Sequence, residues 1–368
     1  MHKVQLGYHL SPAADERRTL HHPLMAMLEA VHQTGSISAA ARRLGQSYRH
    51  VWGELKRWEI ELGHPLVVWV KGQPATLSPF GDKLLWAERR ALARLAPELE
   101  ALRAELERVF DVAFDDAAGL IPMYASHDEA LPRLRDWAAR ERRLHLDIQF
   151  TGSVDALAAL NDGRCLVAGF HALVAAPRDS PTARVYRPML KPGVHKLIGF
   201  AARTQGLIVA AGNPLGITSL AGLARPGVRF VNRQRGTGTR VVLEELLGAA
   251  GIESGRIGGF DRTEPSHQAV AECVASGSAD AAFGIEAVAR ARALDFVALA
   301  QERYFLVTRA ATLEHPNVQA LRALLATPEW IATLEAIPGY TAERSGEVLS
   351  LRAVLPWWSY RTAKRDRR

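Results

Sequence analysis

Apolar positions near the N-terminus repeat at intervals of three and four, which is the period of an α-helix. Three such segments follow one another between residues 22 and 62. The first ends at Gly35, the second begins after the potential cap Ser36 and ends at Gly45, and the third begins after Ser47. Two short helices, a glycine turn and a longer helix match the helix-turn-helix arrangement. The predicted inward-facing side chains are Leu24, Met27, Leu28, Val31, Ile37, Ala40, Ala41, Leu44, Val51, Leu55, Trp58 and Leu62.

Two short apolar runs, residues 65–70 and 75–77, flank a Lys-Gly-Gln-Pro turn and predict a β-hairpin that would form a wing. A long helix is expected from Pro79, with leucines seven residues apart, as in a coiled coil. We interpret it as a dimerising linker helix, with packing against its own domain as the alternative. Pro97 removes one helical N–H and should kink the helix or divide it. The predicted seam consists of Leu85, Leu92, Leu95, Leu99, Leu102, Leu106 and Val109.

Beyond residue 118 the pattern changes to short apolar strands that alternate with helical stretches, which is typical of α/β domains with parallel strands. The expected strands are 120–124, 144–150, 165–170, 196–200, 207–210, 229–232, 281–285, 296–300 and 304–308. This length of alternating pattern suffices for two lobes. The sequence therefore predicts a winged helix-turn-helix domain at 1–82, a linker helix at 83–115 and an α/β domain at 116–368 that ends in a basic tail.

Composition and charge add three expectations. The chain has 368 residues, of which 48% are hydrophobic and 23% charged, as in globular proteins that bury a core. It has neither an apolar run of about 20 residues nor a basic segment followed by an apolar core at its start, so we expect a cytoplasmic protein. Cys165 and Cys273 lack the paired spacing of a zinc or redox site and should be buried hydrophobic residues, without a metal or a disulfide.

The formal net charge of +7 comes from the two ends of the chain. Residues 1–110 and the last twelve residues carry the excess of Lys and Arg, whereas the span between them is neutral. A basic protein favours polyanionic partners such as DNA. The tail residues can be a solvated end of the chain or an additional DNA contact. They are Arg361, Lys364, Arg365, Arg367 and Arg368.

The runs Gly35–Ala41 and Ser47–Trp52, the predicted wing and the stretch Leu77–Gly81 resemble the winged helix-turn-helix of LysR-type regulators and, more closely, that of ModE-type regulators. The resemblance covers residues 22–85. It implies that the exposed start of the third helix contacts base edges in the major groove and that flanking cations contact phosphates. The residues expected to face bases are Ser47, Tyr48, Arg49 and His50, and those expected to contact the backbone are Arg43, Lys56 and Lys71.

A glycine-rich turn in the second half indicates an anion site. A predicted strand ends at Asn232, Gly236–Thr239 follows, and a helix then begins, so free N–H groups, hydroxyls and a helix dipole converge there. The Lys-Ser/Thr ending of a P-loop is absent, which argues against nucleotide hydrolysis. The predicted ligand residues of this turn are Arg233, Arg235, Gly236, Thr237, Gly238, Thr239 and Arg240, although each arginine alone can serve a structural salt bridge.

Other predicted strand ends supply matching donors. Ser126 and His127 follow one strand, Thr151 and Ser153 follow the next, and both pairs open helices at the carboxyl edge of a sheet. Three further residues are candidates for the same ligand. His171 and His267 can also be surface or capping residues, and Glu286 can be a helix cap rather than a ligand contact.

The runs 206–214, 225–240 and 279–286 resemble the type 2 periplasmic-binding-protein fold, which serves as the effector domain of LysR-type regulators. Related domains are fused to ModE-like modules or to molybdopterin-biosynthesis proteins. The resemblance thus implies a molybdenum-related effector, either molybdate or tungstate or a molybdopterin compound, and the many Arg and His candidates favour the larger anion. No other cofactor is expected.

The sequence therefore predicts a ligand-responsive, homo-oligomeric regulator that binds double-stranded DNA. Enzyme chemistry has little support, because the 13 histidines form no His-Glu-x-x-His pair and no Gly-x-Ser-x-Gly turn occurs. Three alternatives remain: a LysR-type regulator that senses a small organic acid, a molybdopterin-linked enzyme or binding protein, and a transport receptor, which would need a signal peptide.

Overall fold

A computed structural model describes residues 22–70, 73–113, 119–173, 178–355 and 357. The chain divides into two compact units, Met1–Leu92 and Ala93–Arg368. Residues 1–21, Lys71 and the basic tail lie outside the described residues, as do the side chains of Pro97 and Val109.

The first unit contains the predicted helix-turn-helix and hairpin. Its helices are α1 (Pro23–Thr34), α2 (Ile37–Arg43) and α3 (Tyr48–Leu62), and its two-residue strands β1 (Val67–Val68) and β2 (Thr76–Leu77) pair antiparallel. Ser36 and Ser47 cap α2 and α3 by accepting hydrogen bonds from Ala39 N and His50 N, as expected from their positions. The predicted apolar faces meet in one buried cluster.

Helix α4 (Pro79–Ala113) begins in the first unit and continues into the second as a single helix, so Pro97 does not divide it. Of the predicted seam, Leu85 is buried in the first unit, whereas Leu95, Leu102 and Leu106 are exposed. An exposed leucine stripe leaves both earlier interpretations of this helix open.

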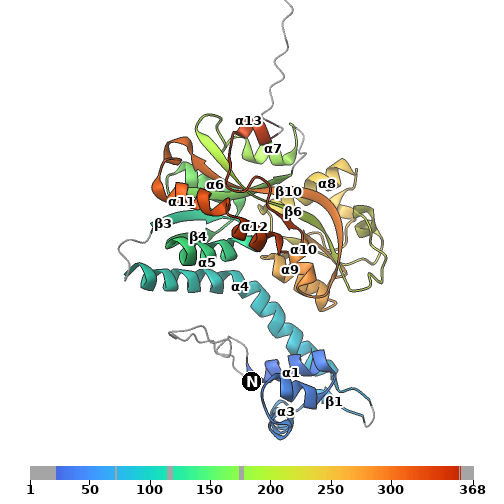
Figure 1. The fold of residues 1–368 in the computed structure, drawn as a ribbon. Coiled ribbons are helices and arrows are strands. Elements are labelled where there is room, and N and C mark those ends of the chain that lie inside the picture. Colours follow the sequence, from blue (N-terminus) through green and yellow to red (C-terminus); the bar gives the residue numbers. More distant parts are fainter. Residues whose placement is uncertain (1–21, 71–72, 114–118, 174–177, 356, 358–368) are drawn as a thin grey trace, which may run out of the picture. The chain divides into compact units, whose positions relative to one another are not determined.

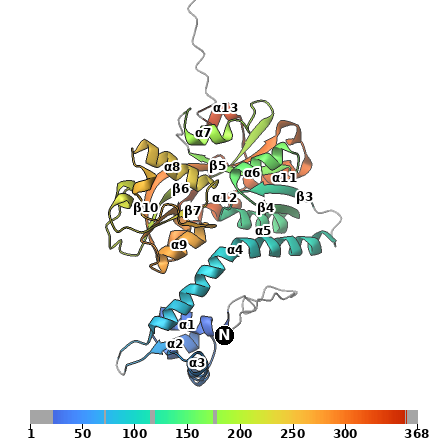
Figure 2. The same ribbon diagram turned by 180° about the vertical axis from the view of Figure 1, so that it is seen from behind.

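The second unit is built on one mixed, strongly curved sheet with helices on both faces (Figure 1, Figure 2). The strand order is β4-β3-β5-β10-β6-β9-β7-β8. The strands are β3 (Gly119–Ala125), β4 (Leu144–Phe150), β5 (Val167–Leu173), β6 (His195–Val209), β7 (Phe230–Arg233), β8 (Thr263–Glu264), β9 (Ala281–Ile285), β10 (Asp295–Arg309), β11 (Tyr340–Thr341) and β12 (Val348–Leu349). The last two strands pair with β6.

Two apolar clusters cover the two faces of this sheet. One cluster packs against α5, α9, α10, α11 and α12, and the other against α6, α7, α8 and α13. Cys273 lies in the first cluster and Cys165 in the second, and both side chains are buried, as predicted. The helices are α5 (Ala130–Arg142), α6 (Ser153–Asn161), α7 (Pro181–Tyr186), α8 (Gly238–Ala249), α9 (His267–Ala275), α10 (Glu286–Arg290), α11 (Pro316–Leu325), α12 (Pro328–Glu335) and α13 (Leu351–Val354), with 3-10 turns at Leu220–Ala224, Ser254–Arg256 and Ala310–Thr312.

The strand boundaries predicted from the sequence were wrong for the two central strands of the sheet. The expected strands 196–200 and 207–210 are one strand, β6, and the expected strands 296–300 and 304–308 are one strand, β10. These two long strands run antiparallel along each other, so the sheet is mixed rather than parallel. The β5 side of the pair forms one lobe, and the β9 side forms the other. The lobes are therefore joined by continuous strands.

The contact of β6 with the 343–345 turn is so close that only glycine fits there. A Cβ atom on Gly199 would lie 2.0 Å from the carbonyl oxygen of Arg344. We predict that Gly199→Ala lowers the free energy of unfolding by about 2–3 kcal/mol, because a backbone atom must move. Urea unfolding of the full chain measures this. In Gly248→Ala, the matched control, the added methyl group meets nothing within 4 Å inside α8, so stability should rise by about 0.5–1 kcal/mol. Equal stability of the two variants would contradict the prediction.

Candidate functional site

The first turn of α3 presents three of the residues expected to contact bases. Tyr48, Arg49 and His50 are exposed, and Tyr48 stacks on Trp52. The Ser47 hydroxyl caps the helix, which gives that residue a structural role whether or not it also faces DNA. Of the expected phosphate contacts, Arg43 is exposed, whereas Lys56 pairs with Glu59 at 2.6 Å and lies over the Trp52 ring.

Nine of the fourteen predicted ligand residues line one cavity of about 180 Å³ in the second unit. They come from the carboxyl ends of β3, β4 and β7, from β5 and from the starts of α8 and α9. The residues brought together are Ser126, His127, Thr151, His171, Arg233, Thr237, Gly238, Thr239 and His267. Their role as ligand contacts stays a prediction.

Two helices begin beside this cavity without a side-chain cap. Thr237 precedes α8 and Gly152 precedes α6, and neither helix has a side-chain hydrogen bond at its N-cap. The turn before α8 packs tightly against the opposite lobe: a Cβ atom on Gly238 would lie 1.9 Å from His171 Nε2, and one on Gly152 would lie 3.4 Å from the Gly236 oxygen. Free N–H groups at two helix starts favour an anion in the space between them.

Arg233 is the most unusual group of the cavity. The residue is only 4% exposed, and its Nε and Nη1 atoms have no hydrogen-bond partner among the described residues. No ion pair of Arg233 is found within that part of the chain, although a buried cation is normally compensated. Burial, together with the nearby Arg203, lowers the pKa of Arg233 to about 9, so the group remains charged at neutral pH.

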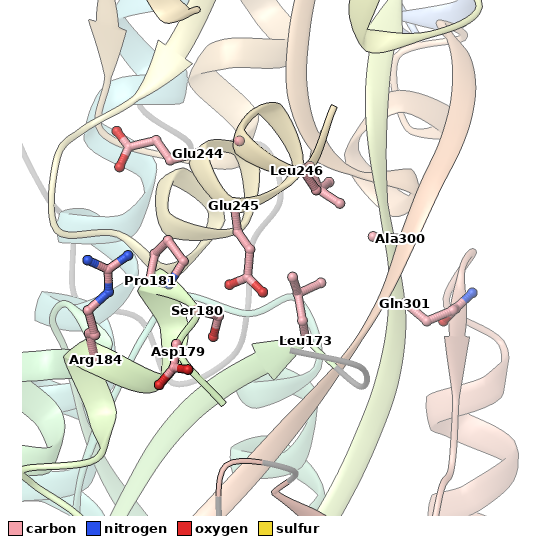
Figure 3. A pocket seen from close by; sticks show the side chains of 12 residues that line it. Leu173, Asp179, Ser180, Pro181, Arg184, Glu244, Glu245, Leu246, Ala300 and Gln301 are labelled. Carbon is pink, nitrogen blue, oxygen red and sulfur yellow. The ribbon is translucent and has the colours of Figure 1, made fainter. Parts of the chain in front are cut away.

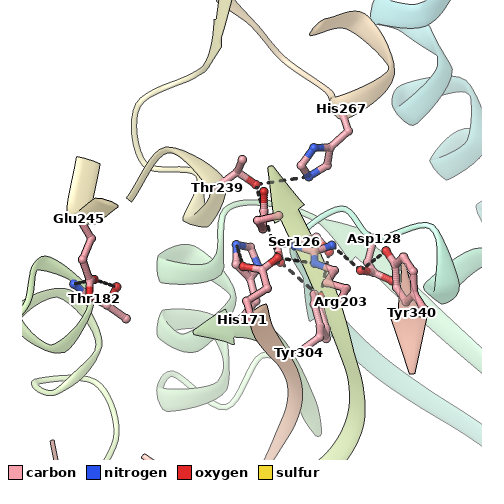
Figure 4. Close-up of polar contacts among 12 residues, drawn as sticks. Ser126, Asp128, His171, Thr182, Arg203, Thr239, Glu245, His267, Tyr304 and Tyr340 are labelled. Atoms are coloured by element: carbon pink, nitrogen blue, oxygen red, sulfur yellow. Dashed lines mark hydrogen bonds and ion pairs between the residues drawn. The ribbon is translucent and has the colours of Figure 1, made fainter. Parts of the chain in front are cut away.

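The three histidines of the cavity are uncharged at neutral pH. Burial lowers the pKa of His127 and of His171 to about 4, and Arg233 acts in the same direction. Burial and Arg233 also hold the pKa of His267 well below its ordinary value. Hydrogen bonds fix two of these rings: one joins His171 Nδ1 and Ser126 Oγ at 3.2 Å, and the other joins His267 Nε2 and Thr239 Oγ1 at 3.3 Å (Figure 4). These rings can therefore serve as neutral hydrogen-bonding groups.

The other five predicted ligand residues do not line the cavity. Arg235 is 83% exposed and lies 3.4 Å from Asp261. Arg240 is turned into the lobe, where it pairs with Glu244 and lies over the ring of Phe260. Glu286 pairs with Arg290 on its own helix, Ser153 is fully buried at the start of α6, and Gly236 forms the turn before α8 at φ +85°.

The structure also adds cavity residues that the sequence did not single out. Gly152 and Gln234 are sequence neighbours of predicted residues, and their positions beside two strand ends could have been used to predict them as ligand residues. Pro265 precedes the predicted His267 by two residues. Arg94 and Glu98 come from α4, more than 130 residues away from the glycine turn, and no sequence pattern connects them with it.

A larger cavity, of about 860 Å³, is open between α7, α8 and β10 and contains none of the predicted residues (Figure 3). Its walls are mostly apolar. The buried carboxylate at its edge, Glu245, accepts hydrogen bonds from the backbone N–H and the hydroxyl of Thr182 and thereby ties α8 to α7. The chemistry expected of an effector site is therefore concentrated in the smaller cavity.

The described residues contain neither a metal-binding cluster nor a membrane-spanning helix. No group of three or more His, Cys, Asp or Glu side chains there is arranged to hold a metal ion. Among the described helices, none combines the length and apolar character needed to span a membrane.

A family model described as a PBP superfamily domain matches residues 134–326, more than half of the chain. The chain belongs to the PBP superfamily. A second model, described as a bacterial regulatory helix-turn-helix protein of the LysR family, matches residues 23–82. The predicted combination of a LysR-type helix-turn-helix with a PBP-like domain is thus confirmed. The closer likeness to ModE-type modules stays a prediction.

Similarity to individual proteins is lower. YvgK of Bacillus subtilis is 30% identical over 201 residues, which are 55% of this chain and 64% of that protein. The molybdenum-pterin-binding protein MopB of Rhodobacter capsulatus is 27% identical over 171 residues, covering 39% of this chain and 62% of MopB. The chain therefore spans less than two thirds of either relative. A hydrogen-peroxide-bound OxyR variant of Corynebacterium glutamicum is 16% identical with a TM-score of 0.45, covering 87% of this chain and 97% of that one.

The neutral histidines predict a loss of stability in acid. His127 and His171 have pKa values of about 4 in the folded protein, against an ordinary value of 6.5. The unfolded chain therefore binds these protons first, and stability that is present above pH 6.5 is lost as the pH falls toward 4, by up to about 1.4 kcal/mol per pH unit and histidine.

The measurement is the urea unfolding free energy at pH 4 to 7 for the wild type and for the double variant His127→Gln/His171→Gln. The variant should show a shallower decline across this range. Parallel pH profiles of the two proteins would mean that these histidines do not titrate differently on folding.

Proposed function

We propose that the protein is a ligand-responsive transcription regulator whose effector is a small anion held in the 180 Å³ cavity. The observation that carries this proposal is Arg233, a buried guanidinium that faces the cavity without a carboxylate partner in the described chain. An anion would compensate this charge through charge-assisted hydrogen bonds. The uncapped starts of α6 and α8 and the hydroxyls of Thr151 and Thr239 supply further donors.

The size of the cavity favours a tetrahedral oxyanion such as molybdate or tungstate. Cavities for drug-sized ligands measure about 300–1,000 Å³, so 180 Å³ suits a ligand of a few heavy atoms better than a molybdopterin compound. This differs from the larger anion that the sequence favoured. The similarity to MopB, whose name describes molybdenum-pterin binding, supports the molybdenum-related part of the proposal. A small organic acid would fit the same volume and remains the second candidate.

The proposed DNA-binding surface is the first turn of α3 together with the hairpin. LysR-family membership of residues 23–82 and the exposure of Tyr48, Arg49 and His50 support this assignment. We further propose a homo-oligomer that pairs through α4, because Leu95, Leu102 and Leu106 are 39%, 48% and 37% exposed at coiled-coil spacing. A twofold pair of winged modules would bind an inverted repeat.

Anion binding can be tested by substituting, in separate variants, two arginines that lie two positions apart in the sequence. Calorimetry with sodium molybdate should show that Arg233→Met weakens binding at least about 30-fold, because a charged hydrogen bond contributes about 2–3 kcal/mol. Arg235→Met is the matched control, and its affinity should stay within about twofold, because this side chain is exposed and outside the cavity. Tungstate and a small organic acid are measured in parallel. Equal affinities of both variants would place the anion elsewhere, and binding of the organic acid alone would retain the cavity but reject molybdenum.

The DNA assignment predicts different effects for two exposed arginines. In Arg49→Ala, discrimination between the preferred duplex and random DNA should fall by about 1–3 kcal/mol, because a base contact is lost. In Arg43→Ala, both affinities should fall together and the salt dependence should become shallower, because a phosphate contact is lost. The preferred duplex is obtained by selection from a random pool, and affinities are measured at several salt concentrations. If both variants weaken specific and random binding equally, the distinction between base and phosphate contacts is wrong.

A further inference from the structure

The cavity has a wall that belongs to the linker helix. Arg94 and Glu98, one helical turn apart on α4, line it together with Arg233, His127 and His267. Both α4 residues belong to the second unit, which begins at Ala93. The helix that continues from the helix-turn-helix unit thus contributes side chains of opposite charge to the proposed effector site.

Four consecutive residues, 264–267, connect α4 to the cavity, and their side chains alternate between the two. Pro265 and His267 line the cavity, whereas Glu264 and Ser266 hold α4. The Glu264 side chain is only 1% exposed, and its carboxylate accepts two hydrogen bonds from Arg94. Arg94 Nε donates to Oε2 at 2.6 Å, and Arg94 Nη2 donates to Oε1 at 2.7 Å. A ligand that displaced His267 would therefore also displace Glu264 and Ser266, which hold α4.

The second connection compensates the proline of α4. Pro97 has no N–H, so the carbonyl of Ala93, four residues earlier, lacks its helical donor. The Ser266 hydroxyl donates to this carbonyl at 2.9 Å and accepts from Ala269 N at 3.0 Å as the cap of α9. One hydroxyl thus joins α4 to the helix that begins with His267.

The two α4 side chains should act on an anion in opposite directions. Glu264 engages two of the five N–H groups of Arg94, whose side chain is 45% exposed, so the guanidinium keeps donors for a ligand. Glu98 is an exposed carboxylate at the same wall. A negative ligand would attract Arg94 and repel Glu98.

We propose that α4 is part of the effector site: Arg94 contacts the bound oxyanion, Glu98 opposes it, and Ser266 transmits occupancy of the cavity to the linker helix. This inference rests on the proposed anion-binding function. It means that the effector acts on α4 itself rather than only on the closure of the two lobes.

The contribution of α4 to binding is measured by calorimetry of the full chain with sodium molybdate. Arg94→Gln should weaken binding about 5- to 20-fold, and Glu98→Gln should strengthen it about 3- to 10-fold. The matched controls Arg256→Gln and Glu253→Gln make the same charge changes at exposed positions outside the cavity and should stay within twofold of the wild type.

Transmission is measured as the ratio of affinities for the selected duplex with and without molybdate. Ser266→Ala should reduce the effect of molybdate on DNA affinity, so that this ratio lies at least threefold closer to one than in the wild type. Ser266→Thr keeps a hydroxyl and should restore it, which a general loss of stability would not predict. Ser219→Ala, at a position without a side-chain cap bond, is the control and should leave the ratio unchanged.

The outcomes separate this inference from the proposed function. If the wild type binds no oxyanion, both are rejected. If the wild type binds molybdate and Arg233→Met abolishes binding, the proposed function stands; unchanged affinities in Arg94→Gln and Glu98→Gln would then overturn the role of α4 in binding. An unchanged ratio in Ser266→Ala would overturn its role in transmission.

Discussion

The second unit depends on one fully buried cation, Arg203, at the point where β6 and β10 pass from one lobe to the other. Its guanidinium pairs with the carboxylate of Asp128 (Figure 4) and with that of Glu302. The other groups around it complete the network: Tyr340 donates to Asp128 at 2.9 Å, and Gln205 donates to Glu302 at 2.7 Å. Removing one partner from such a buried pair typically costs about 3–5 kcal/mol, because a charge is left uncompensated.

This network also determines the electrostatics of the cavity. Burial alone would raise the pKa of Glu302, but Arg203 and His171 outweigh it and hold the pKa below the ordinary value. Asp128 and Glu302 both pair with Arg203, so neither of these two carboxylates compensates Arg233. The network reaches the cavity through Gln205, which donates to Thr239 Oγ1 at 3.3 Å. Among the described residues, the pairing of both carboxylates with Arg203 thus leaves Arg233 without an ion pair.

The same network explains where sequence-based prediction succeeded and failed. The helix-turn-helix and most strands were predictable, because their apolar periodicity and caps are local. The two long strands were not, because Arg203 and Gln205 interrupt one apolar pattern and Glu302 interrupts the other. In the sheet, Glu302 lies directly opposite Arg203, so these polar residues are paired inside the strands instead of forming loops. Such pairing joins positions about one hundred residues apart and leaves no local pattern.

The candidate site divides in the same way. Residues at strand ends were predictable from local order, as Thr151 and Thr237 illustrate, whereas Arg240 was misplaced because its partners Glu244 and Phe260 are fixed by packing of the lobe. Arg94 could not be assigned, because its connection to Glu264 is tertiary.

Pro97 illustrates the same limit in a different form. The sequence correctly identifies a missing donor in α4, but it cannot show that another element replaces that donor. In an uninterrupted helix the Ala93 carbonyl would be fully engaged by the N–H four residues later, and Ser266 would have a weaker acceptor there. The helix stays continuous at Pro97 because Ser266 replaces the lost hydrogen bond. The same proline leaves the Ala93 carbonyl free to accept that bond, through which α9 holds α4. A substitution of Pro97 by a residue with an N–H would restore the helical donor to the Ala93 carbonyl and thereby weaken the hydrogen bond by which Ser266 holds α4.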